Sequence, residues 1–63
     1  MKIKEMRLAA GLTQQDVADR MGVDRSTVSY WETNTSYPRG EQIPKLADIF
    51  GCTIDALYGR DTA

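Results

Sequence analysis

The segment TQQDVADRMGVDRSTVSYWETNTSY, residues 13–37, is the part of this chain around which the rest is expected to fold. It holds two runs of apolar residues at helical spacing, which Gly22 separates. The first run follows Thr13, which forms with Asp16 a T-x-x-D pattern that signals the start of a helix. The second run covers residues 25–33. We therefore expect two short helices joined by a tight glycine turn.

The second of these helices has two different faces. Val28 and Trp31 are three residues apart, so both are expected to point into a core. Hydroxyl and β-branched residues make this segment a mediocre helix by propensity, and packing of the inner face must hold it. Arginine, hydroxyl and phenol groups can hydrogen-bond to the edges of DNA bases, which predicts that the outward face reads DNA. That outward stripe consists of Arg25, Ser26, Ser29, Tyr30 and Thr33.

A short pattern predicts the other helix boundaries. Glycine, an apolar residue and a Thr or Asp follow one another at residues 11–13, 22–24 and 51–53. The glycine ends one helix in the left-handed conformation, and the Thr or Asp side chain accepts a hydrogen bond from the next helix. With a longer loop at residues 33–40, these joints predict an all-α fold of five short helices. We expect them near residues 2–10, 13–21, 25–33, 41–50 and 53–58, before a frayed tail at 59–63.

The core is predicted from apolar positions at helical spacing. Arg7 lies beside the inward stripe of its helix and therefore needs an acidic partner. Asn34 is expected to take the left-handed conformation after the third helix. Pro44 fits only the first turn of a helix, which places the start of the fourth helix near residue 41. The expected inward residues are Ile3, Met6, Ala10, Val17, Ala18, Met21, Val28, Trp31, Ile43, Leu46, Ala47, Phe50, Ile54 and Leu57.

The composition excludes several classes of function. With 63 residues, one cysteine (Cys52) and no histidine, the chain has no intramolecular disulfide, and we expect no metal site and no cofactor. No apolar run approaches the roughly 20 residues of a membrane span, and the start MKIKEMRLAA lacks a signal-peptide core. We expect one cytoplasmic domain over residues 1–63. An enzyme is not expected, because no nucleophile is paired with a base and the chain is too short for a deep pocket.

The charge balance predicts modest, salt-sensitive binding to DNA. Eight basic residues against nine acidic ones give a net charge of −1 and a pI near 5.1, whereas nucleic-acid binders are more often basic. Phosphates respond to charges within about 8–10 Å, so the local distribution matters more than the sum. Between residues 25 and 40 the basic residues are Arg25 and Arg39, and Glu32 is the single acidic residue. The later acids are Glu41, Asp48, Asp55 and Asp61.

Three runs of residues resemble the phage repressor/Cro helix-turn-helix family. They are R-x-x-x-G-L-T-Q-x-x-V-A from residue 7, G-V-D-x-S-T-V-S-x-W-E from residue 22, and K-L-A-D-I-F-G-C-T-I-D-A-L from residue 45. The resemblance covers residues 3–58 and implies a lambda-repressor-like fold. In that fold the second and third helices form the helix-turn-helix, and the third lies in the DNA major groove. Three positions depart from the pattern: Asn34 replaces a usual glycine, Gly40 replaces a common apolar residue, and Pro44 is a second unusual residue near the start of the fourth helix.

Carried onto matching positions, the resemblance implies roles for single residues. Arg25, Ser26, Ser29 and Tyr30 are expected to read bases. Gln14, Thr27, Thr33 and Arg39 are expected to contact phosphates, which set register rather than sequence. Arg7 and Glu32 are expected to form a structural ion pair. The residues themselves leave alternatives open: Arg25 can pair with Asp24, the two serines can simply be solvated, and the Tyr30 ring can pack on the following loop.

The function implied is that of a sequence-specific regulator of transcription, expected to be a repressor on double-stranded DNA. One recognition helix spans few base pairs, so we expect a weak homodimer on a two-fold operator, with half-sites about 34 Å apart. An alternative is a protein-interaction module, such as the antitoxin of a toxin–antitoxin pair, that holds a protein partner on the same scaffold.

Overall fold

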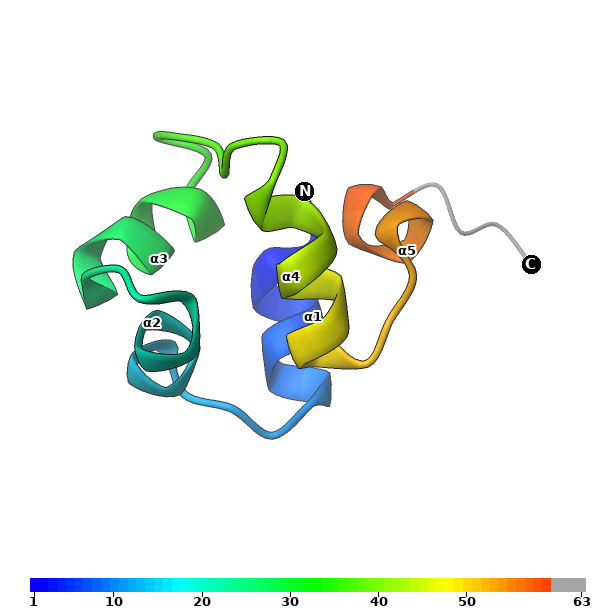
Figure 1. Ribbon diagram of the computed structural model, residues 1–63, viewed down its shortest axis with the longest axis horizontal. Helices are drawn as coiled ribbons and strands as arrows, with labels where there is room; N and C mark the ends of the chain where they lie inside the picture. Colours follow the sequence, from blue (N-terminus) through cyan, green and yellow to red (C-terminus); the bar gives the residue numbers. More distant parts are fainter. Residues whose placement is uncertain (60–63) are drawn as a thin grey trace.

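Five α-helices form the part of the chain that the computed structural model describes, residues 1–59 (Figure 1). No strand occurs within these residues, so the all-α prediction is confirmed. Within the same residues, every helix is too short or too polar to cross a membrane. The helices are α1 Ile3–Ala9, α2 Gln14–Met21, α3 Arg25–Glu32, α4 Gln42–Phe50 and α5 Ile54–Tyr58.

The turns between helices follow the glycine pattern of the sequence. Gly11, Gly22 and Gly51 take φ values of 71°, 70° and 65°, in the left-handed region that an L side chain rarely adopts. Asn34 has a φ of 61° and does the same one residue after α3 is capped by Thr33. Each of these residues turns the chain sharply, so the short helices pack against one another at steep angles.

The helix starts differ in how their free N–H groups are satisfied. The Thr13 hydroxyl accepts from the Asp16 N–H at 3.0 Å, and the Asp16 carboxylate accepts from the Thr13 N–H at 2.9 Å. Thr53 caps α5 by accepting from the Ala56 N–H at 3.0 Å. The prediction for Asp24 is wrong, because its side chain makes no capping hydrogen bond even though it occupies the N-cap position of α3. The first turn of α3 therefore lacks a side-chain acceptor.

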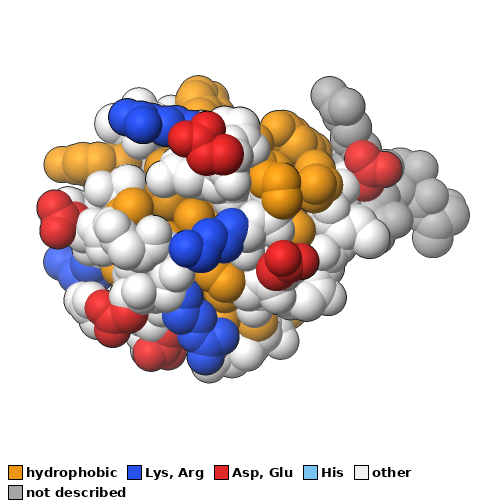
Figure 2. Space-filling model, in the orientation of Figure 1, with side chains coloured by type: hydrophobic (Ala, Val, Ile, Leu, Met, Phe, Trp, Pro, Cys, Tyr) orange, Lys and Arg blue, Asp and Glu red, His pale blue; other side chains and the backbone are white. Residues whose placement is uncertain are grey.

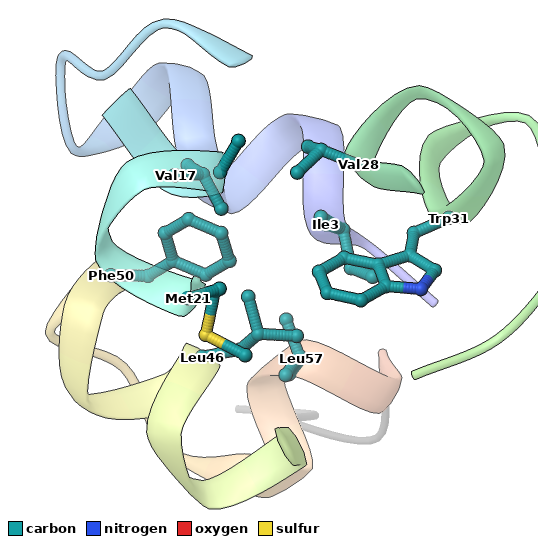
Figure 3. Packing of buried hydrophobic residues seen from close by; sticks show 9 residues of the cluster. Ile3, Val17, Met21, Val28, Trp31, Leu46, Phe50 and Leu57 are labelled. Atoms are coloured by element: carbon teal, nitrogen blue, oxygen red, sulfur yellow. The ribbon is translucent and has the colours of Figure 1, made fainter. Parts of the chain in front are cut away.

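The core lies between the helices and receives side chains from all of them (Figure 3). Val28 and Trp31 are the contribution of α3, and Trp31 is only 2% exposed. Met6, Ile43 and Cys52 are partly buried around this cluster. The predicted inward faces of α2, α3 and α4 are thus confirmed. The buried cluster consists of Ile3, Val17, Ala18, Met21, Val28, Trp31, Leu46, Phe50 and Leu57, with Ala47 also buried.

Two residues predicted to face the core are exposed. Ala10 follows the end of α1 and serves as its cap, so Arg7 rather than Ala10 turns inward. Ile54 is 41% exposed, because the five-residue α5 has α4 beside it and buries only Leu57 fully.

The ends of the predicted helices need smaller corrections. Pro44 lies in the first turn of α4, as predicted, but that helix begins at Gln42. The expected tail starts at Gly59, which ends α5 with a φ of 80°; the rest of it falls outside the described residues.

Candidate nucleic-acid interface

The helix α3 lies at one end of the molecule, and α5 lies at the other (Figure 1). Val28 and Trp31 anchor α3 through its buried face, which packs against α2 and α1. Since those two side chains supply its fully buried contacts, the opposite face remains in solvent. The local sequence therefore holds a helix of modest propensity in place while leaving one of its faces unused by the fold.

The exposed face of α3 carries the residues predicted to read bases. Arg25 and Ser26 are exposed, Ser29 is half-buried, and the Tyr30 side chain is 51% exposed. Within residues 1–59, the side chains of Ser26, Ser29 and Tyr30 form no hydrogen bond. Their donors and acceptors are therefore available to a ligand. Whichever part of the Tyr30 ring contacts the following loop, half of the side chain stays exposed to solvent.

A partly buried ion pair joins α1 to the end of α3. The Arg7 Nε donates to the Glu32 Oε2 at 2.7 Å, and the Arg7 Nη2 donates to the Glu32 Oε1 at 3.3 Å. The Arg7 Nη1 donates to the Leu12 carbonyl at 2.9 Å. The side chains of Arg7 and Glu32 are 10% and 4% exposed. This is the pair that the resemblance implies, and it turns the one carboxylate of α3 away from the exposed face.

Gln14 connects this ion pair to Arg25. Its amide Nε2 donates to the Glu32 Oε1 at 3.0 Å, and its Oε1 accepts from the Arg25 Nη1 at 3.3 Å. Arg25 therefore bonds to Gln14, and within residues 1–59 it forms no ion pair with Asp24. A continuous hydrogen-bonded path thus runs from Arg7 in the interior to the guanidinium of Arg25 at the surface. We call it the Arg7–Arg25 relay.

The relay limits what Gln14 can offer to DNA. An amide nitrogen carries two N–H groups, and Glu32 takes one of them. The other N–H stays available to a phosphate, together with the backbone N–H groups at the start of α2, where the helix dipole favours an anion. The predicted phosphate contact by Gln14 is therefore compatible with the relay.

The other three residues predicted to contact phosphates flank α3 in different ways. Thr27 is half-buried, and its side chain bonds to nothing within residues 1–59. The Thr33 hydroxyl donates to the Tyr30 carbonyl at 3.3 Å and lies 2.9 Å from the Thr35 hydroxyl, so its proton is already used. Arg39 is exposed in the loop beyond α3. A contact by Thr33 would have to exchange a local bond for one to DNA.

Charges of both signs are interspersed on the face of the molecule drawn in Figure 2, without an extended basic patch there. That pattern accords with the net charge of −1. Binding of DNA by this chain would therefore rely on individually placed contacts more than on a general positive field. Within residues 1–59, no group of three or more His, Cys, Asp or Glu side chains could hold a metal ion.

Two features of this region were absent from the sequence prediction. Tyr37 is 65% exposed, the highest exposure among the large hydrophobic side chains of the described residues. The sequence did contain a signal for this exposure, because Tyr37 is an aromatic residue in a polar loop that follows the candidate recognition helix. The bridge from Gln14 to Arg25 had no such signal, because it depends on residues that meet only after folding.

The comparisons with known proteins agree with this geometry. Residues 3–57 match the family described as helix-turn-helix (HTH). The chain is 34% identical over 60 residues to the HTH-type transcriptional activator BcrR of Enterococcus faecalis, covering 95% of this chain and 29% of BcrR. It is 36% identical over 56 residues to the cryptic phage CTXphi transcriptional repressor RstR of Vibrio cholerae, covering 89% of this chain and 50% of RstR.

A third relative is closer to this chain in length. It is an uncharacterized HTH-type transcriptional regulator of Archaeoglobus fulgidus, 32% identical over 57 residues, which cover 90% of this chain and 81% of that protein. The chain thus spans half or less of BcrR and RstR but most of the archaeal protein. No solved structure matches this chain. With its motifs, its five helices and these matches, this chain belongs to the helix-turn-helix family, in its phage repressor/Cro-like branch.

Proposed function

We propose that this chain is a sequence-specific DNA-binding regulator of transcription that places α3 in the major groove of its operator. The observation that carries the proposal is the exposed face of α3, where Arg25, Ser26, Ser29 and Tyr30 hold polar groups that the fold leaves largely unused. Family membership supports it, because the curated relatives are named regulators of transcription.

Arg25 is the leading base-reading residue in this proposal. A guanidinium has five N–H donors, and the bond to Gln14 uses one of them. The remaining donors suffice for a bidentate contact to a guanine edge, which contributes about 1–3 kcal/mol of discrimination. Gln14 restricts the orientation of the guanidinium before DNA arrives, so less conformational freedom is lost on binding.

The neighbouring residues complete the contact. Ser26 and Ser29 can donate to or accept from a base edge, and Tyr30 combines a hydroxyl with an apolar ring suited to a thymine methyl group. The second Gln14 amide N–H, together with the hydroxyl of Thr27 and the guanidinium of Arg39, would hold the DNA backbone on either side. Thr33 would join them once its local hydrogen bond is exchanged.

Two copies of the chain are needed for useful specificity. The eight residues of α3 extend about 12 Å at 1.5 Å per residue, which covers few base pairs. A two-fold operator with half-sites about 34 Å apart would engage two recognition helices and roughly double the contact. We propose that a weak homodimer forms on this operator and represses transcription; RstR, to which this chain is similar, is named a transcriptional repressor.

A titration tests the proposal. The ligand is a palindromic duplex selected from random DNA with this protein, and a scrambled duplex of equal length is the control. Fluorescence anisotropy between about 50 and 200 mM salt should show weakening with salt on both duplexes and tighter binding to the selected one. If binding neither weakens with salt nor favours the selected duplex, the proposal is wrong, and binding to a protein partner becomes the leading function.

The homodimer is tested separately by the number of copies bound. Sedimentation of the complex should give two chains per full palindrome, and a duplex that carries one half-site should bind more weakly. A single chain on the full palindrome, with the affinity of the half-site, would contradict the dimer without touching the role of α3.

A further inference from the structure

The loop between α3 and α4, residues 33–41, presents an aromatic side chain to solvent. Tyr37 is 65% exposed, whereas Pro38 beside it is buried and Arg39 after it is exposed. This alternation places Tyr37 and Arg39 on the outer side of the loop and Pro38 on the inner side. The exposed ring contributes little to the core, so its contact surface is available to a ligand.

The backbone on either side of Tyr37 is fixed. The Tyr30 carbonyl accepts from the Thr35 N–H at 2.9 Å and from the Ser36 N–H at 3.3 Å. On the other side, the Arg39 N–H donates to the Gln42 Oε1 at 2.8 Å, and the Gln42 N–H donates to the Arg39 carbonyl at 2.9 Å. A side chain on a fixed backbone loses less conformational freedom when it binds.

These anchors also set where Tyr37 lies. It follows Ser36, whose N–H contacts the Tyr30 carbonyl, so it starts within about two residue lengths of the last base-reading candidate of α3. Figure 1 shows the loop leaving the end of α3 and passing above it. A duplex in contact with Tyr30 therefore brings its backbone close to the loop.

The chemistry of the loop favours a phosphate. A phenol offers one O–H donor, and within residues 1–59 the Tyr37 hydroxyl has no partner. Arg39 is the single charged side chain from residue 33 to residue 40, and the one carboxylate of the loop, Glu41, lies at its far end, four residues from Tyr37. Tyrosine hydroxyls and arginines are among the groups that proteins use to hold the DNA backbone.

We propose that Tyr37 is a DNA-backbone contact: its hydroxyl donates to a phosphate oxygen beside the base pairs that Tyr30 reaches, and Arg39 neutralises a neighbouring phosphate. The inference rests on the proposed function and adds a residue to it. A contact of this kind fixes the position of α3 on the duplex and carries no sequence information.

The test removes only the hydroxyl, with the variant Tyr37→Phe. Anisotropy titrations use the duplex selected by the parent protein and its scrambled control over a range of salt concentrations. Loss of one hydrogen bond should weaken binding roughly 3- to 10-fold on both duplexes. The salt slope should stay at the parent value, because a phenol displaces no counterion, whereas Arg39→Gln should lower the slope by about 0.9.

A second tyrosine, far from α3, provides a control for position. Tyr58→Phe deletes the same atom on α5, at the opposite end of the molecule from α3, and should bind both duplexes as the parent does (Figure 1). Thermal melting of Tyr37→Phe should match the parent, since the ring is exposed. Equal losses in the two tyrosine variants would contradict a local contact.

The remaining outcomes separate this inference from the function beneath it. If the parent binds DNA and Tyr37→Phe binds equally well, the inference is wrong and the proposed function stands. A loss confined to the selected duplex would also overturn it, because that result means base reading. If the parent binds neither duplex, the proposed function itself fails.

Discussion

The two helices of the helix-turn-helix use their polar groups in opposite ways. The first turn of α2 is closed by the reciprocal bonds of Thr13 and Asp16, and on its exposed side the Gln15 amide donates to Asp19 at 2.8 Å. In α3, which has the same length of eight residues, Asp24 makes no capping bond. Its exposed hydroxyls at Ser26 and Tyr30 bond to nothing within residues 1–59.

This difference separates the polar groups that stabilise the fold from those that remain available to a binding partner. Satisfied polar groups stabilise α2 from its own surface, while α3 depends on its inner face and on the relay that starts at Arg7. Unused donors and acceptors on a helix add nothing to stability, but they are what a binding partner requires. Substitutions can therefore separate residues that hold α3 from residues that α3 merely presents.

The largest effect is expected at the inner face of α3. Trp31→Ala should lower the free energy of unfolding by roughly 3–5 kcal/mol, because it removes a buried ring from the core. Tyr30→Ala, the adjacent exposed position, should change it by less than about 0.5 kcal/mol. Urea unfolding followed by circular dichroism measures the stability of both variants. A Trp31→Ala variant as stable as the parent would contradict the division of α3 into a buried face and an exposed face.

The ion pair comes next in size. Glu32→Ala leaves the Arg7 guanidinium largely buried without a carboxylate, which should cost roughly 3 kcal/mol of stability. The double variant Arg7→Met with Glu32→Leu should be more stable than the single Glu32→Ala variant, since no unpaired charge remains. Glu41→Ala, an exposed acid in the loop before α4, is the control. A double variant less stable than Glu32→Ala would show that the pair holds the fold by more than charge.

The two N-caps should respond differently. Thr13→Ala should destabilise the fold by about 1 kcal/mol, because it breaks the reciprocal capping of α2. Asp24→Ala should change stability by less than about 0.5 kcal/mol, since its carboxylate caps nothing. Thermal melts of the two variants give the comparison directly, and equal losses would show that α3 is capped in solution after all.

The smallest effect is a dependence on pH at the start of α2. The hydrogen bond from the Thr13 N–H holds the pKa of Asp16 below its usual value of 3.8. A carboxyl with a lowered folded-state pKa stabilises the folded state above pH 3.8, and that stabilisation disappears as the pH falls through and below this value. The difference in melting temperature between the parent and Asp16→Asn should therefore shrink in acid. A constant difference from about pH 6 to about pH 2 would exclude this linkage.

Local signals in the sequence were enough for the helices and for most of the core. Gly22 and Gly51 each end a helix in the left-handed conformation, which glycine adopts easily. Val28 and Trp31 are three residues apart, so they lie on the same face of any helix that contains both. Ile54 was misplaced because spacing does not reveal how many neighbours a helix has: α5 packs mainly beside α4, and the Lys2 N–H donates to the Leu57 carbonyl at 2.8 Å.

The site was harder to predict, for physical reasons. A capping residue in the sequence does not settle whether its side chain caps: Thr53 does and Asp24 does not, although neither has an acidic residue at the third helical position to reciprocate. The relay joins Gln14 to Arg25, 11 positions away in the sequence, and to Glu32, 18 positions away. These contacts exist only in the folded chain. The resemblance supplied Arg7 and Glu32 as a pair, and the structure added that Gln14 extends the pair to Arg25.

The variant Arg25→Ala tests whether the exposed face of α3 reads DNA. Arg25→Ala should weaken binding to the selected duplex by about 1–3 kcal/mol and leave the scrambled duplex much less affected. The melting temperature should stay at the parent value, and Lys45→Ala, an exposed cation on α4, should spare the preference between the two duplexes. An equal loss on both duplexes would contradict the account, because Arg25 would then contact phosphates and not bases.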